Sequence, residues 1–255
     1  MNDGSVNYSV SDGVAVITLD RPQAMNALNR AMRDGLWAGF RRLAGDEEAA
    51  VGVLTGNGEQ AFCAGADLKE IAAEGLTIPP SDYLPHLNRN FRLEKPVLAA
   101  VNGVALGGGF WLAQMCDLCL AAENASFGVT EARWGRGMPW AAPLPWLISP
   151  RVAMEMFLTA EPITAARAYQ LGLVNRVVAG PQLMPTAIQM AKTIAANAPL
   201  SVKAAKAMVY ATASRPWSDA LDEAGRIFAP VYESEDAREG AIAFTERRPP
   251  RWQGK

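Results

Sequence analysis

Runs of apolar residues alternate with segments of helical spacing along the first half of the chain. The strand-like runs are residues 6–10, 14–19, 51–55, 96–101 and 118–122. Helices are expected between them, at about 29–43, 66–73 and 82–92. Asn29 can cap the first helix, whose apolar face consists of Met32, Leu36, Phe40 and Leu43. This alternation predicts an α/β fold with a mostly parallel sheet and helices outside it.

The second half of the chain has a different pattern. Residues 139–146 are rich in proline and tryptophan, and the chain is helical in character from Pro150 onward. Helices are expected at 164–172, 181–197, 201–213, 218–231 and 235–247, with a short strand at 173–178. The apolar faces of these helices fit a partner interface, and an intrachain core explains them equally well.

Composition narrows the class of protein. Half of the 255 residues are hydrophobic, 20% are charged and the formal net charge is −2, so neither nucleic acid nor a membrane is indicated as a partner. No apolar run approaches the ~20 residues of a membrane span, and residues 1–5 lack a signal pattern, so we expect a cytoplasmic protein. Cys63, Cys116 and Cys119 are expected to be buried free thiols. The chain has one histidine, so no metal site is expected.

A glycine-rich turn is the first candidate for chemistry. Gly107, Gly108 and Gly109 follow an apolar run and precede a segment of helical character. Glycines at a helix start let a ligand approach the backbone, and the unpaired N–H groups there stabilise negative charge. A tight packing turn would use the same residues, so this motif alone leaves both interpretations open.

A second turn of small residues has the same arrangement. Residues 60–70 lead from the strand at 51–55 into a helix. Two such turns placed side by side could offer one N–H group each to a single oxygen, which is an oxyanion hole made of backbone.

These motifs together resemble the enoyl-CoA hydratase/isomerase (crotonase) family. The resemblance is carried by residues 61–69, 102–109 and 127–131 and covers nearly the whole chain. It implies a spiral core of ββα units with the acyl-CoA site in residues 1–195, and a C-terminal helical region in 196–255 that mediates a homotrimer or a dimer of trimers. It also implies an acyl-CoA thioester as substrate, with coenzyme A as part of that substrate and no separate cofactor.

The resemblance assigns roles to individual residues. The N–H groups of Ala66 and Gly108 would hold the thioester oxygen, and Glu131 would be the catalytic base. Hydratases of the family use a second glutamate, and Trp111 occupies that position here. The remaining contacts to the acyl-CoA are expected from Gln23, Ala24, Met25, Ala64, Asp67, Leu68, Lys69, Phe244 and Arg247.

A single carboxylate favours a double-bond shift, since one group can move one proton between two carbons. The alternatives are a hydratase or another lyase or hydrolase of the family, and a protein that binds acyl-CoA without turnover. Asp67 is expected to cap or brace its turn. Tyr83 and His86 could line the acyl pocket, and four tryptophans are expected around it: Trp111, Trp134, Trp140 and Trp146.

Overall fold

The computed structural model describes residues 3–255, and its core contains two β-sheets. The larger sheet has the strand order β1-β2-β3-β5-β7-β10. Its strands are β1 (Ser5–Ser11), β2 (Val14–Asp20), β3 (Val51–Gly56), β5 (Val97–Val101), β7 (Leu118–Ala122) and β10 (Arg176–Val178). β1 and β2 form the expected hairpin, in which Asp12 and Gly13 both have positive φ, and the other pairings are parallel.

The smaller sheet was not predicted from the sequence. Its order is β4-β6-β8-β9, with strands β4 (Ala61–Cys63), β6 (Val104–Leu106), β8 (Ser126–Gly128) and β9 (Ile163–Thr164). These strands have two or three residues each, too few to show a period of two. Successive strands alternate between the two sheets, as β3 and β4, β5 and β6, and β7 and β8 do, which produces the spiral of ββα units expected for the fold.

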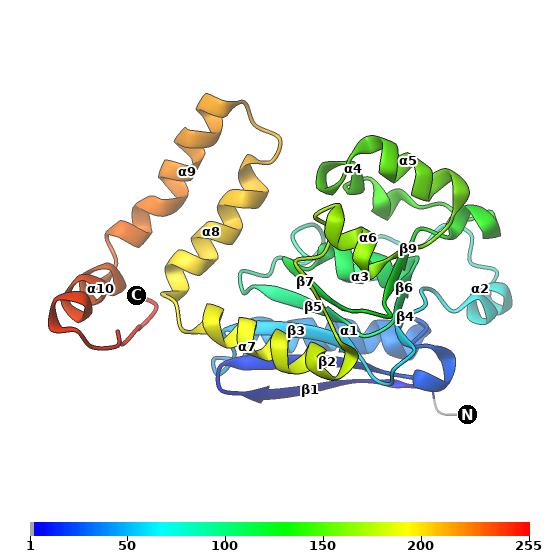
Figure 1. Ribbon diagram of the computed structural model, residues 1–255, viewed down its shortest axis with the longest axis horizontal. Coiled ribbons are helices and arrows are strands. Elements are labelled where there is room, and N and C mark those ends of the chain that lie inside the picture. The colour runs from blue at the N-terminus through cyan, green and yellow to red at the C-terminus, as the bar shows by residue number, and fades with distance from the viewer. Residues whose placement is uncertain (1–2) are drawn as a thin grey trace.

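Helices cover both faces of the larger sheet (Figure 1). On one face α1 (Arg30–Gly45) and α3 (Gly108–Met115) pack into the main apolar core, which includes Ile17, Leu36, Phe40, Phe62, Phe110 and Phe127. On the other face α7 (Leu183–Ala195) packs against Val53, Leu98 and Leu120. Asn29 caps α1 as predicted, since its side chain accepts from the backbone N–H of Met32 at 3.1 Å.

The C-terminal helices extend away from the sheets (Figure 1). They are α8 (Pro199–Thr212), α9 (Trp217–Tyr232) and α10 (Glu235–Glu246). α8 is tied to the core through Asp117, which accepts from Lys206 at 2.8 Å and from the Tyr210 hydroxyl at 2.9 Å. The chain turns between α7 and α8, close to the predicted boundary at residue 195, and the division into two domains stays a prediction.

The remaining elements are short helices. They are η1 (Pro22–Ala24), α2 (Leu68–Glu74), η2 (Glu131–Trp134), η3 (Pro139–Ala141), α4 (Leu144–Leu147), α5 (Pro150–Thr159), α6 (Ala165–Gln170) and η4 (Gly180–Gln182). In Figure 1, α2, α4 and α5 lie on the side of the sheets away from the C-terminal helices. Within residues 3–255, no helix combines the length and the apolar character that crossing a membrane requires.

The helix expected at 82–92 is absent, and this prediction was wrong. The segment instead forms a series of turns, in which Asn88 has a φ of +65°. The Asn90 side chain accepts from the backbone N–H of His86 at 2.7 Å and donates to two carbonyl oxygens, those of Ser81 and Leu84. Asparagine bonds of this kind compete with helical backbone bonds, and Pro85 removes a backbone donor.

Candidate active site

The two glycine-containing turns meet at the edge of the smaller sheet. A Cβ built on Gly65 would lie 3.3 Å from the Gly108 nitrogen, and a Cβ built on Gly108 would lie 3.7 Å from the Ala66 nitrogen. Gly65 and Gly107 have φ of +97° and +51°, which side chains rarely adopt. A Cβ on Gly109 would overlap the backbone oxygen of Cys63. Only glycine therefore permits the two turns to come this close.

The N–H groups of Ala66 and Gly108 have no acceptor among residues 3–255. Leu28 pairs with the first turn, donating to the Gly65 oxygen at 2.8 Å and accepting from the Asp67 nitrogen at 3.4 Å. This parallel pairing leaves the Ala66 N–H directed away from Leu28. Gly108 begins α3, and the first N–H groups of a helix have no partner within it. Two neighbouring donors are thus available to a ligand.

The loop before α1 braces the first turn. The Ala64 nitrogen donates to the Met25 oxygen at 2.9 Å, so the loop that carries Met25 lies beside Ala64. Asn26 is fully buried, and its side chain donates to the Ala61 oxygen at 2.9 Å. A cavity of about 310 Å³ opens next to this loop, and its lining includes Pro22, Met25, Asn57 and Gln60.

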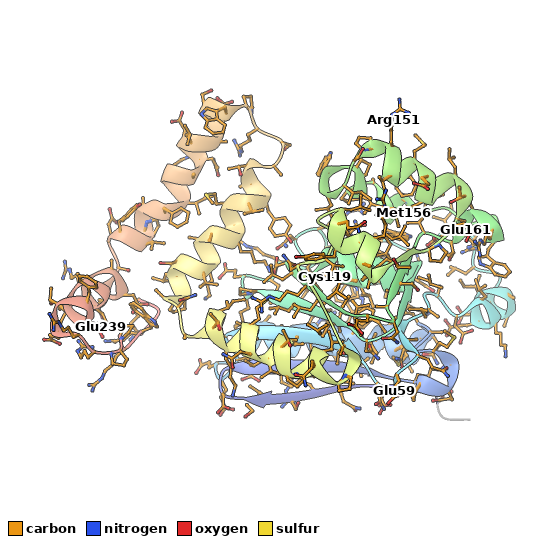
Figure 2. All side chains as sticks on the ribbon, in the orientation of Figure 1. Glu59, Cys119, Arg151, Met156, Glu161 and Glu239 are labelled. Atoms are coloured by element: carbon orange, nitrogen blue, oxygen red, sulfur yellow. The ribbon has the colours of Figure 1, made fainter. Side chains whose placement is uncertain are left out.

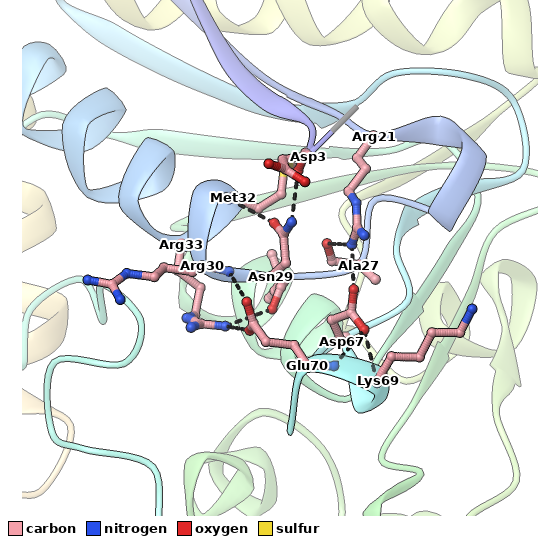
Figure 3. Close-up of polar contacts among 12 residues, drawn as sticks. Asp3, Arg21, Ala27, Asn29, Arg30, Met32, Arg33, Asp67, Lys69 and Glu70 are labelled. Atoms are coloured by element: carbon pink, nitrogen blue, oxygen red, sulfur yellow. Dashed lines mark hydrogen bonds and ion pairs between the residues drawn. The ribbon is translucent and has the colours of Figure 1, made fainter. Parts of the chain in front are cut away.

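Two ion pairs hold the start of α2 (Figure 3). Asp67 caps α2 by accepting from the nitrogens of Lys69 and Glu70, and it pairs with Arg21 at 2.7 Å. Burial alone would raise the pKa of Asp67, but the bonds from Arg21 and from the backbone outweigh it and the pKa is lowered. Asp67 is therefore an ionised brace, as expected, while the Lys69 side chain extends away from it.

The second ion pair joins α2 to α1. Arg33 donates to Glu70 at 2.5 Å and to the Leu28 oxygen at 3.1 Å, while the other Glu70 oxygen accepts from the Arg30 nitrogen at 2.7 Å (Figure 3). The Arg33 guanidinium also lies 4.3 Å from the centre of the Tyr83 ring. We call Arg21, Arg33, Asp67 and Glu70 the charged side of the site.

Glu131 lies beside the second turn. The pairing of β6 with β8 places Gly128 opposite Leu106, and the Gly107 nitrogen donates to the Gly128 oxygen at 2.9 Å. Three residues on, Glu131 places one carboxyl oxygen 3.1 Å from where a Cβ on Gly107 would be. This oxygen accepts from the Trp140 indole at 2.9 Å, and the second carboxyl oxygen is buried without a partner among the described residues. Burial raises the pKa of Glu131, and hydrogen bonds, including that of Trp140, oppose the rise.

Three aromatic rings line up beside Glu131. Trp111 stacks on Trp140, with ring centres 6.3 Å apart and planes 7° from parallel. Trp111 also meets His86 edge to face, at 5.3 Å and 70°. We call His86, Trp111, Glu131 and Trp140 the aromatic side. Two of the four tryptophans expected here do not join it, because Trp134 and Trp146 are 62% and 75% exposed.

The structure does not bring every predicted residue to this site. Phe244 is 85% exposed on α10, and Arg247 follows that helix, at the opposite end of the molecule from α2 (Figure 1). Figure 2 labels Glu239, which is also on α10, at this same end of the molecule, far from the sheets. Leu68 lies at the start of α2 and is 43% exposed.

Several site residues were not singled out from the sequence. Arg21 and Arg33 hold the charged side, and Asn26 braces the loop that carries Met25. Arg33 is next to Met32 on α1, so the helical pattern identified its neighbour in the core and not the arginine itself. What distinguishes Arg33 is its burial, since this arginine is only 9% exposed. Burial is known only from the folded structure, so the sequence held no signal for Arg33.

The cysteines and other metal-ligating groups offer no competing chemistry. All three cysteines are buried and unpaired, as expected, and Cys119 lies among packed side chains in Figure 2. Burial raises the pKa of the Cys63 thiol to about 12, so it stays protonated near neutral pH. Within residues 3–255, no three His, Cys, Asp or Glu side chains are grouped as a metal site requires.

Comparison with known proteins agrees with this architecture. The enoyl-CoA hydratase/isomerase family model matches residues 9–255, so the chain belongs to that family. It is 39% identical to a carnitinyl-CoA dehydratase from Salmonella typhi, over 98% of this chain and 99% of that protein. It matches the structure of an enoyl-CoA hydratase from Mycobacterium tuberculosis H37Rv with a TM-score of 0.90 and 38% identity, over 98% and 99% of the two chains. A hydratase/isomerase from Mycobacterium paratuberculosis gives a TM-score of 0.90 at 32% identity, with the same coverage.

Proposed function

We propose that the protein shifts a double bond in an enoyl-CoA thioester, with Glu131 as its single base. One observation carries this proposal: Glu131 lies beside the Gly107 turn with one carboxyl oxygen unpartnered among the described residues. The family resemblance implies in addition that Trp111 stands where the hydratases have a second glutamate. An indole cannot serve as a proton carrier in that role. The site therefore offers one proton carrier next to two free amides.

The proposed reaction uses both features of the site. The Glu131 carboxylate removes a proton from the α-carbon of a 3-enoyl thioester, and the electron pair moves onto the thioester oxygen, giving a dienolate. The N–H groups of Ala66 and Gly108 stabilise that oxygen as its charge develops. Glu131 then returns the proton to the γ-carbon, which yields the 2-enoyl thioester. A raised pKa suits this task, because a base that must return its proton works best with a pKa closer to neutral.

The experiment compares two reactions in two variants. Isomerisation of 3-hexenoyl-CoA is measured by the appearance of the conjugated product, and hydration of crotonyl-CoA by its loss. Glu131→Gln should lower isomerisation by ~10²–10⁴ while acyl-CoA binding persists. Glu161→Gln is the matched control, because Glu161 is an exposed carboxylate paired with Arg133. Full activity in Glu131→Gln would refute the single-base mechanism.

Dehydration or hydration is the second candidate, and the names of relatives favour it. The Salmonella typhi relative is named a carnitinyl-CoA dehydratase, and the Mycobacterium tuberculosis structure is an enoyl-CoA hydratase. Wild-type hydration of crotonyl-CoA that is faster than isomerisation would select this candidate. Tight binding of every thioester without turnover would indicate an acyl-CoA-binding protein.

We further propose a homotrimer or a dimer of trimers in the cytoplasm, with the nucleotide part of coenzyme A held by Gln23, Ala24, Met25 and Lys69. Phe244 and Arg247 are too remote to act in their own chain, so we assign them to the nucleotide of a neighbouring subunit. Exposed apolar side chains on α8 and α9, including Val209, Trp217 and Leu221, support an interface there. Light scattering that gives a monomer at micromolar concentration would contradict this assembly.

A further inference from the structure

Two nitrogen atoms on the aromatic side have no partner. The indole nitrogen of Trp111 and Nδ1 of His86 are both buried, and neither has a hydrogen-bond partner among residues 3–255. Their rings contact each other, with centres 5.3 Å apart. An unpaired buried polar group is destabilising, and folded proteins retain few of them. Two unpaired nitrogens on rings that contact each other indicate that a single bound group pairs with both nitrogens.

The chemistry of the two atoms defines that group. An indole nitrogen can only donate, whereas a nitrogen of a neutral imidazole can accept. Burial, and then the positive charge of Arg89, lower the pKa of His86, so its ring is neutral near pH 7. With the ring proton on Nε2, Nδ1 is an acceptor, so a carbonyl oxygen would satisfy the indole alone and an ammonium group the imidazole alone. A hydroxyl group satisfies both, because it accepts from Trp111 and donates to His86.

The position of the pair relates it to the proposed reaction. Trp111 lies one turn after Gly108 on α3, and its backbone nitrogen donates to the Gly107 oxygen at 2.9 Å. The Trp111 ring also stacks on Trp140, which donates to Glu131. The unpaired nitrogens are therefore part of the same wall as the proposed base. His86 is fixed on this wall by the bond from its backbone nitrogen to Asn90 at 2.7 Å.

We propose that Trp111 and His86 form a subsite for one O–H group, supplied either by a hydroxyl on the acyl chain or by a water molecule held beside it. This inference rests on the proposed function, because it needs the acyl-CoA to lie between Ala66, Gly108 and Glu131. It adds a preference to the proposed isomerisation: the enoyl thioester either carries a hydroxyl group on its acyl chain or binds with a water molecule beside that chain. Without such a hydroxyl group or water molecule, both nitrogens would stay unpaired.

Binding measurements test whether the O–H group belongs to a hydroxyl on the acyl chain. Calorimetry would give dissociation constants for butyryl-CoA, 3-hydroxybutyryl-CoA and 4-hydroxybutyryl-CoA in a Glu131→Gln background, in which turnover does not consume the ligand. We expect one hydroxylated ligand to bind at least tenfold more tightly than butyryl-CoA. Adding Trp111→Phe or His86→Phe should abolish that preference and leave butyryl-CoA binding intact. Adding His86→Asn, whose amide occupies the place of Nδ1, should preserve the preference for the hydroxylated ligand. Adding His86→Gln should abolish that preference.

Hydration of crotonyl-CoA, measured in proteins that retain Glu131, tests whether the O–H group belongs to a water molecule beside the acyl chain. If water fills the subsite, His86→Phe should lower hydration at least tenfold, His86→Asn should retain most of it, and all three butyryl ligands should bind alike. Trp146→Phe is the matched aromatic control, because Trp146 is 75% exposed on α4 and does not belong to the aromatic side. Equal binding of the three ligands, together with hydration that is indifferent to His86, would overturn the subsite alone. Failure of butyryl-CoA to bind even the wild-type chain would overturn the proposed function instead.

Discussion

The charged side and the aromatic side of the site treat their polar groups in opposite ways. On the charged side, the carboxylate of Asp67 is matched by Arg21 and that of Glu70 by Arg33, each reinforced by backbone N–H donors. On the aromatic side, Glu131, His86 and Trp111 each keep a buried polar atom without a partner among the described residues.

This difference separates support from chemistry. On the charged side both carboxylates are paired and help to fix the backbone of the first turn, and the buried atom left without a partner there is Nε of Arg21, a member of one of those pairs. Unpaired groups reduce the stability of the fold by about 1–3 kcal/mol each, and they persist where a ligand completes them. The charged side thus holds the amide pair in place, while the aromatic side supplies the proposed base and the contacts to the acyl chain.

Both sides depend on the close approach of the two turns, so breaking that approach should have the largest effect. Gly109→Ala places a methyl group against the backbone oxygen of Cys63, which cannot move aside as a side chain could. We expect the free energy of unfolding to fall by at least ~3 kcal/mol, measured by urea denaturation. Gly225→Ala is the control, because Gly225 lies in α9 with open space around it and should gain up to ~1 kcal/mol. Equal stability of Gly109→Ala and wild type would show that the turns tolerate separation.

Removing one partner on the charged side should have the next largest effect. Arg33→Met leaves the carboxylate of Glu70 half-buried with a single backbone donor, and we expect a loss of ~2–3 kcal/mol in the free energy of unfolding. The double variant Arg33→Met/Glu70→Met should recover part of this loss. Arg92→Met is the control, since the Arg92–Glu94 pair is exposed and should contribute less than ~1 kcal/mol. A loss in Arg92→Met as large as that in Arg33→Met would remove the distinction between support and surface.

The local sequence was sufficient to predict the features of the two turns. The glycines at 65 and 107–109 and the capping role of Asp67 follow from backbone conformation, which a short stretch of sequence encodes. The long strands and most helices were predicted for the same reason, since their apolar periodicity is visible over five or more residues. The strands of the larger sheet and most helices were therefore accessible from the sequence, whereas the short strands of the smaller sheet were not.

Contacts between distant segments were not accessible in this way. Arg33 meets Glu70 across 37 positions, and Trp140 reaches Glu131 through turns that have no helical spacing. The segment 82–92 has a helix-like composition, yet the side chain of Asn90 organises it into turns that present His86 to Trp111. Side chain bonds of this kind depend on the tertiary fold, and they decide which polar atoms remain free.

The Trp140 bond to Glu131 gives a smaller effect that concerns pH. Glu131 must be ionised to accept a proton, so activity should fall as pH drops through its raised pKa. Trp140→Phe removes a donor that holds this pKa down, so the acid limb of the kcat/KM profile should move to higher pH. The free energy of unfolding should fall by about 1 kcal/mol, as expected for one hydrogen bond. An acid limb that stays in place would mean that another group controls the profile.

The smallest effect distinguishes the two sides by its sign. Because burial raises the pKa of Glu131 above its unfolded value, the folded state holds this proton more tightly than the unfolded chain does. Its contribution to stability is present at low pH and is lost as pH rises through the folded pKa, which leaves a half-buried charge at pH 7. Glu131→Gln removes that charge and keeps the size of the side chain, so Tm at pH 7 should rise slightly even as turnover is lost.

Asp67→Asn should instead lower Tm at pH 7, because the pKa of Asp67 is lowered and its ionised form stabilises the fold above the unfolded pKa. Thermal unfolding of the two variants between pH 4 and pH 8 measures both signs in one series. If Glu131→Gln also lowered Tm at pH 7, Glu131 would belong with the supporting groups, and its unpartnered oxygen would no longer point to chemistry.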